Sequence, residues 1–161
     1  MRPASYGLGS RLPMTDPSAF SPPRSCFFRS FAVAPDDIDV LGHANNVSWV
    51  RWVQDMATSH SDAVGLDLPT YRKLGVVWVV RRHDIEYLAP AFVGEEIRAT
   101  TWVAQVGATS SLRRTVFRRE RDGVELARAE TTWVLVDGRG KPVQVPPALR
   151  EPFERVLEPD A

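Results

Sequence analysis

The sequence predicts an α+β domain in which one long helix lies on one face of an antiparallel sheet. Two observations support this prediction. After Asn46, side chains of one helix face recur every three or four residues, which is the pattern of one buried face of an α-helix. We expect this face to be Trp49, Val53, Met56, His60 and Ala63. From Val76 to Val136, β-favouring runs follow one another with short turns between them, as antiparallel strands do. The order strand, long helix, then four or five strands is typical of α+β proteins.

Length and composition exclude several other classes of protein. The chain has 161 residues, 43% of them apolar, which suits one domain with a hydrophobic core. Its 20 basic and 20 acidic residues cancel, which argues against nucleic-acid and membrane-surface partners. A single cysteine, Cys26, cannot form an internal disulfide, and no apolar run is long enough to span a bilayer, so we expect a cytoplasmic protein. Residues 1–25 are rich in Pro, Ser and Gly and predict a flexible tail, which leaves 26–161 as one domain.

The first predicted elements are a strand and the long helix. Residues 26–34 are aromatic and β-favouring, so we expect a strand that Pro35 ends. The helix is expected to begin at Asn45 or Asn46, because a side-chain oxygen there can accept a hydrogen bond from a first-turn amide. Gly65 is the expected C-terminal stop of this helix.

The rest of the chain predicts a short helix and the remaining strands. Residues 67–75 indicate the helix, and residues 76–87 a long strand. Further strands are expected at 96–105, 111–120 and 125–136. Their solvent face is expected to carry Arg113, Arg118, Arg119 and Arg128. A tight turn at 137–140 leads to residues 141–145, and Pro147 begins a terminal helix of little apolar content.

A dense polar cluster lies between the first strand and the long helix. Residues 36–50 read D-D-I-D-V-L-G-H-A-N-N-V-S-W-V, which is more polar than a simple linker requires. The first-turn amides of the helix aim their partial positive charge toward Asp39, and Gly42 lets the backbone approach a ligand closely. We therefore take this junction as the candidate site.

The junction resembles the signature of a known enzyme family. D-I-D-V-L-G-H-A-N-N-V-S-W-V is similar to the pattern D-x-D-x-x-G-H-x-N-N-x-x-Y of hotdog-fold acyl-CoA thioesterases of the 4-hydroxybenzoyl-CoA thioesterase, YbgC and FadM type. Two later blocks, at 85–97 and 134–146, also resemble that family, in the same order along the chain. The three blocks together cover residues 27–150, which is far more than a lone motif.

The resemblance implies a fold, an assembly and a reaction. The expected fold is a hotdog, a curved antiparallel sheet of five to six strands wrapped around the long central helix. Its open edge strands are expected to pair in a homodimer or homotetramer, with the active sites between subunits. The implied reaction is hydrolysis of an acyl-CoA to a free acid and CoA, without a metal and without a cofactor.

The motif also assigns roles to residues of the junction. Asp39 matches the family's catalytic acid, and we expect it to activate water or to attack the thioester carbonyl itself. An Asp before a helix is otherwise a turn or cap residue. His43 is expected to contact the carbonyl or to orient Asp39, and a structural bond to the backbone is the alternative. The amides from Gly42 to Asn46 are the expected oxyanion donors. Asp37, the first Asp of the motif, is predicted to position the loop.

Substrate binding is assigned to further residues. The predicted set is Gly42, Asn45, Asn46, Trp49 and Arg82. Trp49 stands at the motif's Tyr position and is expected to line an acyl pocket, although a helix aromatic is more often core. Arg82 is a candidate for the CoA phosphates, whereas paired arginines on strands are more often a solvated face.

Other chemistry has less support in the sequence. His60 and His83 have no metal-ligand partner at useful spacing, so both are predicted to be structural. A G-x-S-x-G elbow is absent, which weakens a serine hydrolase interpretation. Two alternatives to an acyl-CoA thioesterase stay open: an acyl carrier protein thioesterase of the same fold, and a non-catalytic acyl-CoA-binding hotdog module.

Overall fold

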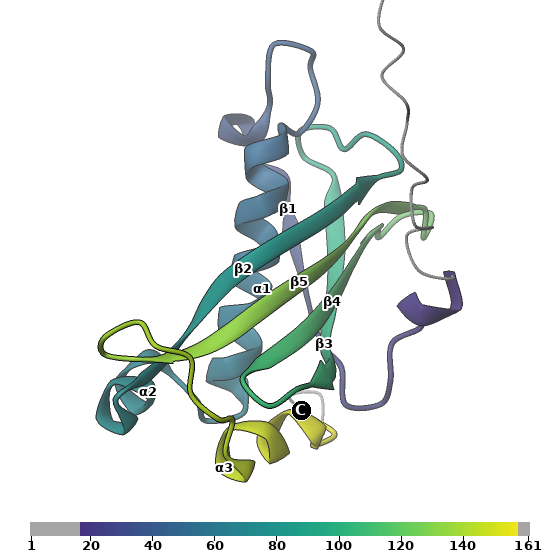
Figure 1. Cartoon of the computed structure of the whole chain (residues 1–161). Helices are drawn as coiled ribbons and strands as arrows, with labels where there is room; N and C mark the ends of the chain where they lie inside the picture. The colour runs from purple at the N-terminus through teal and green to yellow at the C-terminus, as the bar shows by residue number, and fades with distance from the viewer. Residues whose placement is uncertain (1–16, 158–161) are drawn as a thin grey trace, which may run out of the picture.

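A five-stranded antiparallel sheet curves around one long helix in the computed structural model, which describes residues 17–157 (Figure 1). The helix is α1 (Asn46–Ala63). The strands are β1 (Phe27–Ala32), β2 (Val76–Tyr87), β3 (Glu96–Val106), β4 (Ser110–Arg119) and β5 (Glu125–Asp137). They lie in the order β1-β3-β4-β5-β2, so β1 and β2 are the two edges. The predicted α+β class and the sheet wrapped around a helix are confirmed.

Shorter helices lie around this frame. α2 (Leu68–Leu74) and α3 (Pro147–Arg150) lie at the C-terminal end of α1, and the polar junction lies at the other end (Figure 1). The 3-10 turns are η1 (Pro17–Phe20), η2 (Pro35–Asp37) and η3 (Glu151–Glu154). Residues 141–145 add no strand and contribute one bridge, from Pro142 to Val136. No helix among residues 17–157 is long and apolar enough to cross a membrane.

Local sequence signals set both ends of α1. The Asn45 side chain accepts a hydrogen bond from the Ser48 amide at 2.8 Å, which identifies Asn45 as the N-cap. At the other end Gly65 has a φ of +84°, a conformation that suits glycine. The Gly65 amide donates to the Asp62 carbonyl, and the next amide, of Leu66, donates to the Ser61 carbonyl at 2.8 Å. This pair of bonds stops the helix at the predicted position.

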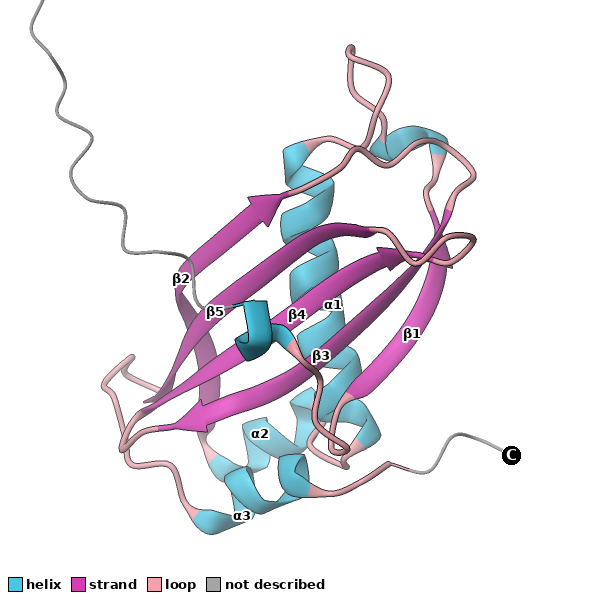
Figure 2. Ribbon diagram, turned by 90° about the vertical axis from the view of Figure 1, so that its right-hand side faces the viewer, coloured by secondary structure: helices cyan, strands magenta, loops and turns pink. Residues whose placement is uncertain are grey.

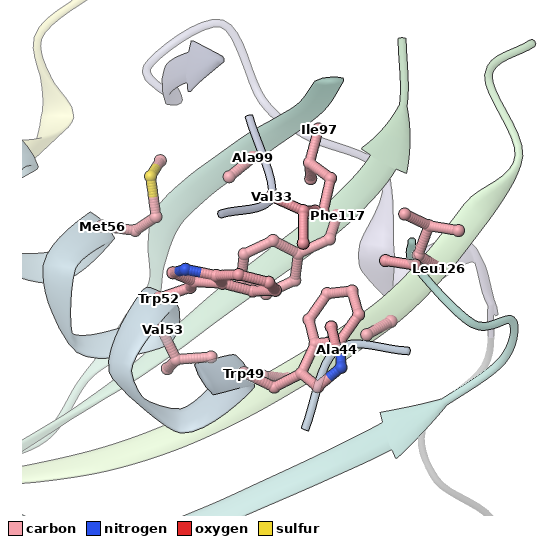
Figure 3. Packing of buried hydrophobic residues seen from close by; sticks show 13 residues of the cluster. Val33, Ala44, Trp49, Trp52, Val53, Met56, Ile97, Ala99, Phe117 and Leu126 are labelled. Carbon is pink, nitrogen blue, oxygen red and sulfur yellow. The ribbon is translucent and has the colours of Figure 1, made fainter. Parts of the chain in front are cut away.

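The main core forms where α1 meets the sheet. Trp49 and Trp52 of α1 pack edge to face, with ring centroids 4.9 Å apart, and Phe117 of β4 contacts Trp49 in the same way at 5.3 Å (Figure 3). The predicted buried positions Trp49, Val53, Met56 and His60 are confirmed. Ala63, which was expected on that face, is exposed, because the chain is already leaving the sheet at the end of the helix.

The ends of the chain are more tightly packed than their composition predicts. Phe20 of η1 is only 2% exposed and packs with Trp102 and Val116 on the face of the sheet opposite α1 (Figure 2). Residues 17–20 of the predicted tail thus form a packed 3-10 turn, and residues 1–16 lie outside the described part of the chain. The C-terminal helical segment was predicted to have little apolar content, but its side chains Leu149 and Phe153 are both buried.

One predicted solvent-facing arginine is buried instead. Arg113 is 4% exposed, because its side chain shares the inner face of β4 with Thr115 and Phe117. Its Nη1 donates to Nδ1 of the fully buried His60 at 3.0 Å. The other three predicted arginines, Arg118, Arg119 and Arg128, are partly exposed and pair with acidic side chains.

The buried imidazole gives the fold a specific pH dependence. Burial and then the charge of Arg113 lower the pKa of His60 from 6.5 to about 3. Between these values the unfolded chain binds more protons than the folded one. Stability is therefore complete above the unfolded pKa and falls as the pH drops toward 3, by at most about 1.4 kcal/mol per pH unit from this group.

Urea unfolding measured across this pH range tests the assignment. His60→Gln removes the titrating group and keeps a carbonyl that can accept from Arg113, so it should flatten the pH dependence. His83→Gln on β2 is the matched control, and it should retain the His60 contribution. An unchanged slope in His60→Gln would contradict the assignment.

Candidate active site

The buried carboxylate of Asp37 holds the junction between β1 and α1. It is 3% exposed and accepts hydrogen bonds from the Ser48 hydroxyl at 2.8 Å, the Ala34 amide at 3.0 Å and the Arg51 guanidinium. Its carbonyl also accepts from the Asn45 amide at 2.8 Å. Burial alone raises the pKa of this carboxyl, but the hydrogen bonds and the charge of Arg51 outweigh it and lower the pKa below 3.8. Asp37 is thus an ionised anchor between the loop and the first turns of α1.

Asp39 lies in a tight turn beyond this anchor. Its Oδ1 accepts from the Leu41 amide at 2.8 Å, and its carbonyl accepts from the Gly42 amide at 3.0 Å. Gly42 closes the turn with a φ of +85°, where a side chain would be strained. The Asp39 amide donates to the His43 carbonyl, so the two residues face each other across the turn. The second oxygen of Asp39, Oδ2, has no partner among the described residues, which leaves it available to a ligand.

The loop hydrogen bonds narrow the predicted set of oxyanion donors. The amide of Gly42 is engaged by Asp39, that of Ala44 by the Ala91 carbonyl at 2.8 Å, and that of Asn45 by Asp37. The amides of His43 and Asn46 take part in none of the described loop and cap bonds. Asn46 is the first residue of α1, where an amide has no partner within the helix. These two amides are therefore the donors that remain.

The side chains of the other predicted site residues have different surroundings. His43 Nδ1 lies 3.5 Å from the Ala44 carbonyl, which is a long contact, and the residue is partly exposed. Asn45 uses its side-chain oxygen as the helix cap. Trp49 is in the core, in contact with Trp52 and Phe117, and is 3% exposed. Arg82 lies on the edge strand β2, largely exposed, with an ion pair to Asp84 at 3.2 Å.

The structure brings together some of the predicted residues and separates others. Asp39, Gly42, His43 and Asn46 belong to one turn and the helix start that follows it. Trp49 faces the core beneath this turn. Arg82 lies on β2, which pairs with β5 and not with the turn that carries Asp39. No group of three or more His, Cys, Asp or Glu side chains placed to hold a metal occurs between residues 17 and 157.

Sequence reasoning missed an apolar surface beside Asp39. Val40 and Leu41, at the tip of the turn, and Val47, on the first turn of α1, are all strongly exposed. Apolar side chains held in water next to a free carboxylate oxygen indicate a surface that another molecule covers. The sequence shows that Val40, Leu41 and Val47 are apolar, but no local sequence signal indicates that their side chains are exposed.

The arrangement is suited to one kind of chemistry. A partly exposed carboxylate with one fixed oxygen can activate a water or attack a carbonyl, and nearby free amides can stabilise an oxyanion. The exposed valines and leucine add contacts for an apolar substrate. The fold and site together define a hotdog hydrolase candidate for activated acyl compounds.

Comparison with known proteins identifies the family. A family model described as the thioesterase-like superfamily matches residues 33–153, so this chain belongs to that superfamily. A chloroplastic acyl-[acyl-carrier-protein] hydrolase from Cuphea viscosissima is 24% identical over 132 residues, which are 78% of this chain and 32% of the relative. The chain thus spans about a third of the length of that curated relative.

Solved structures agree on the fold. A 1,4-dihydroxy-2-naphthoyl-CoA thioesterase from Synechocystis superposes with a TM-score of 0.75 at 18% identity, covering 83% of this chain and 99% of that one. A Staphylococcus aureus protein solved in complex with CoA has a TM-score of 0.75 at 15% identity, covering 80% and 82% of the two chains. This chain therefore has the hotdog fold of these two solved structures.

Replacing the anchor should destabilise the junction. Asp37→Asn removes the charge that three donors share, and we expect the free energy of unfolding to fall by about 2 kcal/mol. Asp36→Asn, at the exposed neighbouring position, is the control and should change it by less than about 0.5 kcal/mol. Denaturant unfolding at neutral pH measures both, and equal effects of the two variants would show that Asp37 is not an anchor.

Proposed function

We infer that this protein hydrolyses acyl-CoA thioesters at the junction of β1 and α1, with Asp39 as the reacting carboxylate. The observation that supports this most is the state of the Asp39 side chain. One oxygen is held by the Leu41 amide and the other is unpartnered among residues 17–157. A catalytic carboxylate needs this combination of fixed orientation and an available lone pair.

The chemistry of a thioester demands little more than the junction offers. The carbonyl is already electrophilic, and a thiol with a pKa near ~8.5 leaves without strong acid assistance. The Asp39 carboxylate either removes a proton from the attacking water or attacks the carbonyl itself. The amides of His43 and Asn46 then donate hydrogen bonds to the oxyanion. The C–S bond breaks, CoA leaves as the thiol with the proton taken from water, and the acyl group leaves as the free acid. In the nucleophilic route, water hydrolyses the mixed anhydride formed with Asp39 and so supplies the same proton and oxygen.

CoA is the preferred carrier of the acyl group, and a protein carrier is the alternative. The motif resembles acyl-CoA thioesterases, and a structural neighbour was solved with CoA bound. The exposed Arg82 is assigned to the CoA phosphates. The acyl carrier protein alternative is favoured by the Cuphea relative, which is named as a hydrolase of acyl groups on that carrier.

We place the enzyme in the reducing cytoplasm, because Cys26 is a free thiol.

The working assembly is a homodimer formed through β2. This strand is hydrogen-bonded to β5 on one side and to no described strand on the other. Val77 and Val79 on it are partly exposed, and a long open edge with apolar side chains favours pairing with a second copy. Two-fold pairing of β2 with itself would produce one continuous sheet. A pair of such dimers, a homotetramer, is the larger alternative.

The role of Asp39 is tested by thiol release from a panel of short, long and aromatic acyl-CoAs. Asp39→Asn keeps the acceptor for the Leu41 amide but removes the charge, so we expect the rate to fall by about 100-fold or more. Its free energy of unfolding should stay within about 0.5 kcal/mol of wild type. Asp36→Asn is the control and should keep wild-type activity.

The outcomes of this assay separate the alternatives. Full activity in Asp39→Asn would overturn its catalytic role. Acyl-CoA binding without thiol release in the wild type would favour the non-catalytic binding module. Faster release from the same acyl group on acyl carrier protein than on CoA would favour the protein carrier.

The dimer is tested by the mass of the protein in solution. Val79→Lys places a positive charge on each of the two β2 strands at the proposed interface, so it should convert the wild-type dimer to a monomer. Val124→Lys is the matched control, because both valines are 41% exposed and Val124 lies in a hairpin turn. Light scattering on both variants measures the effect, and a monomeric wild type would contradict the assembly.

A further inference from the structure

A cavity lies at the opposite end of α1 from the Asp39 turn. Its volume is about 170 Å³. Its walls come from the C-terminal half of α1, from α2, α3 and η3, and from strands β2, β3, β4 and β5. The apolar part of the wall is Leu66, Tyr71, Trp78, Val103, Leu149 and Phe153. Thr58, which lies at its rim on α1, is about 18 Å along the helix axis from Asn46. Within one chain the cavity is therefore separate from the junction.

The cavity contains one buried charge, the guanidinium of Arg113. This group lines the wall although the residue is 4% exposed. All of its hydrogen bonds use one nitrogen: Nη1 donates to His60 Nδ1 at 3.0 Å and to Thr101 Oγ1 at 3.2 Å. Nε and Nη2 have no hydrogen-bond partner in the described part of the chain. The side chain is thus held on one side, and its other two nitrogens have no partner among the described residues.

Arg113 also lacks a counter-ion among residues 17–157. It forms no ion pair within 4.0 Å, whereas Arg114, the next residue along β4, pairs with Glu130. Asp62 lines the cavity but is exposed and forms no such pair. Burial lowers the pKa of Arg113 to about 10, so the group keeps its charge at neutral pH. A buried charge without a partner is costly, and a bound anion would offset that cost.

The neighbours of Arg113 hold the guanidinium in place. His60 is neutral, so its Nδ1 accepts from Arg113 without competing charge. The Thr101 hydroxyl donates to the Arg114 carbonyl at 2.9 Å, which leaves its lone pairs for Arg113 and for the adjacent Thr115 hydroxyl. The orientation of the Arg113 guanidinium is thus fixed before any ligand binds.

We propose that this cavity binds a compact carboxylate with an aromatic or short branched apolar body. The carboxylate pairs with Nε and Nη2 of Arg113 in the two-pronged geometry that guanidinium favours. The apolar body lies between Trp78 and Phe153. The volume suits such a ligand, because a protein cavity of about 150 Å³ is large enough to hold benzene.

The carboxylate can come from two sources. It is a free organic acid, or it is the far end of an acyl group whose thioester end reaches an Asp39 turn. The second source rests on the proposed thioesterase function and on a second copy supplying that turn, whereas the first does not. Direct binding tests the site, and turnover distinguishes the sources.

Binding is measured by calorimetry with benzoate and with its neutral analogue benzamide. Wild type should bind benzoate at least about tenfold more tightly, as expected for a charge-assisted pair, and Arg113→Met should lose this preference. Arg139→Met, in an exposed turn, is the matched control and should retain it. Equal binding of the two probes by wild type, or an unchanged preference in Arg113→Met, would overturn the proposal.

A second variant tests the site without changing Arg113, because Arg113→Met could lose binding simply by unfolding. Thr58→Trp replaces an exposed residue at the rim with a side chain that fills the cavity while Arg113 stays intact. It should unfold at the wild-type temperature and lose benzoate binding. Benzoate binding that survives this substitution would place the ligand elsewhere and overturn the proposal.

The source is identified by turnover of glutaryl-CoA and valeryl-CoA, which have acyl chains of equal length with and without a terminal carboxylate. If the acyl chain supplies the carboxylate, Arg113→Met lowers the ratio of kcat/KM for the two substrates by about tenfold or more. An unchanged ratio, with benzoate binding intact in wild type, assigns the site to a free acid. Absence of turnover with benzoate still bound would refute the thioesterase function alone.

Discussion

The buried carboxylate of Asp37 is the interaction on which the rest of the site depends. It joins the end of η2, the hydroxyl of Ser48 in the first turn of α1 and the guanidinium of Arg51 one turn further on. Removing one partner from a buried charged network leaves the others unsatisfied, so the network persists as a unit. The turn that carries Asp39 begins two residues later, so the Asp37 network also sets the orientation of that turn. Asp37 thus stabilises the junction, whereas Asp39, partly exposed and with one oxygen free of partners among residues 17–157, is available to react.

The two ends of α1 present opposite electrostatic situations. At its N-terminus an acid is held at the surface beside free amides, and these amides suit a developing negative charge. Near its C-terminus a cation, Arg113, is buried against the neutral His60 with two nitrogens unsatisfied. Two core clusters fix these ends. Trp49, Trp52 and Phe117 join the N-terminal half of the helix to the sheet, and a second cluster with Leu66, Leu149 and Phe153 packs at its C-terminal end. The hotdog fold thus positions an anionic side chain, Asp39, and a cationic side chain, Arg113 of β4, near opposite ends of one helix, each with capacity for a ligand.

Much of the fold could be predicted because its signals are local. Asn45 and Gly65 mark the ends of α1 by their own backbone preferences, and the run of β-branched residues from Val76 marks β2. Burial of Arg113 could not be predicted, since its face depends on the register that places Phe117 against α1. Phe20 and Phe153 are buried by segments far away in sequence, which composition does not reveal. The motif pointed to the junction as the candidate site, but it did not show which loop amides are already hydrogen-bonded. The site and the catalytic role of Asp39 stay predictions.

The central claim is that the acyl thioester binds at the Asp39 turn, and an NMR titration tests it most directly. The ligand is an acyl-CoA analogue with a methylene group between the sulfur and the carbonyl, which the enzyme cannot hydrolyse at that position. We predict that the amide signals of His43 and Asn46 shift most, because these amides are free to donate to the carbonyl oxygen. If these signals stay in place while the analogue binds elsewhere on the protein, the account of the site is wrong.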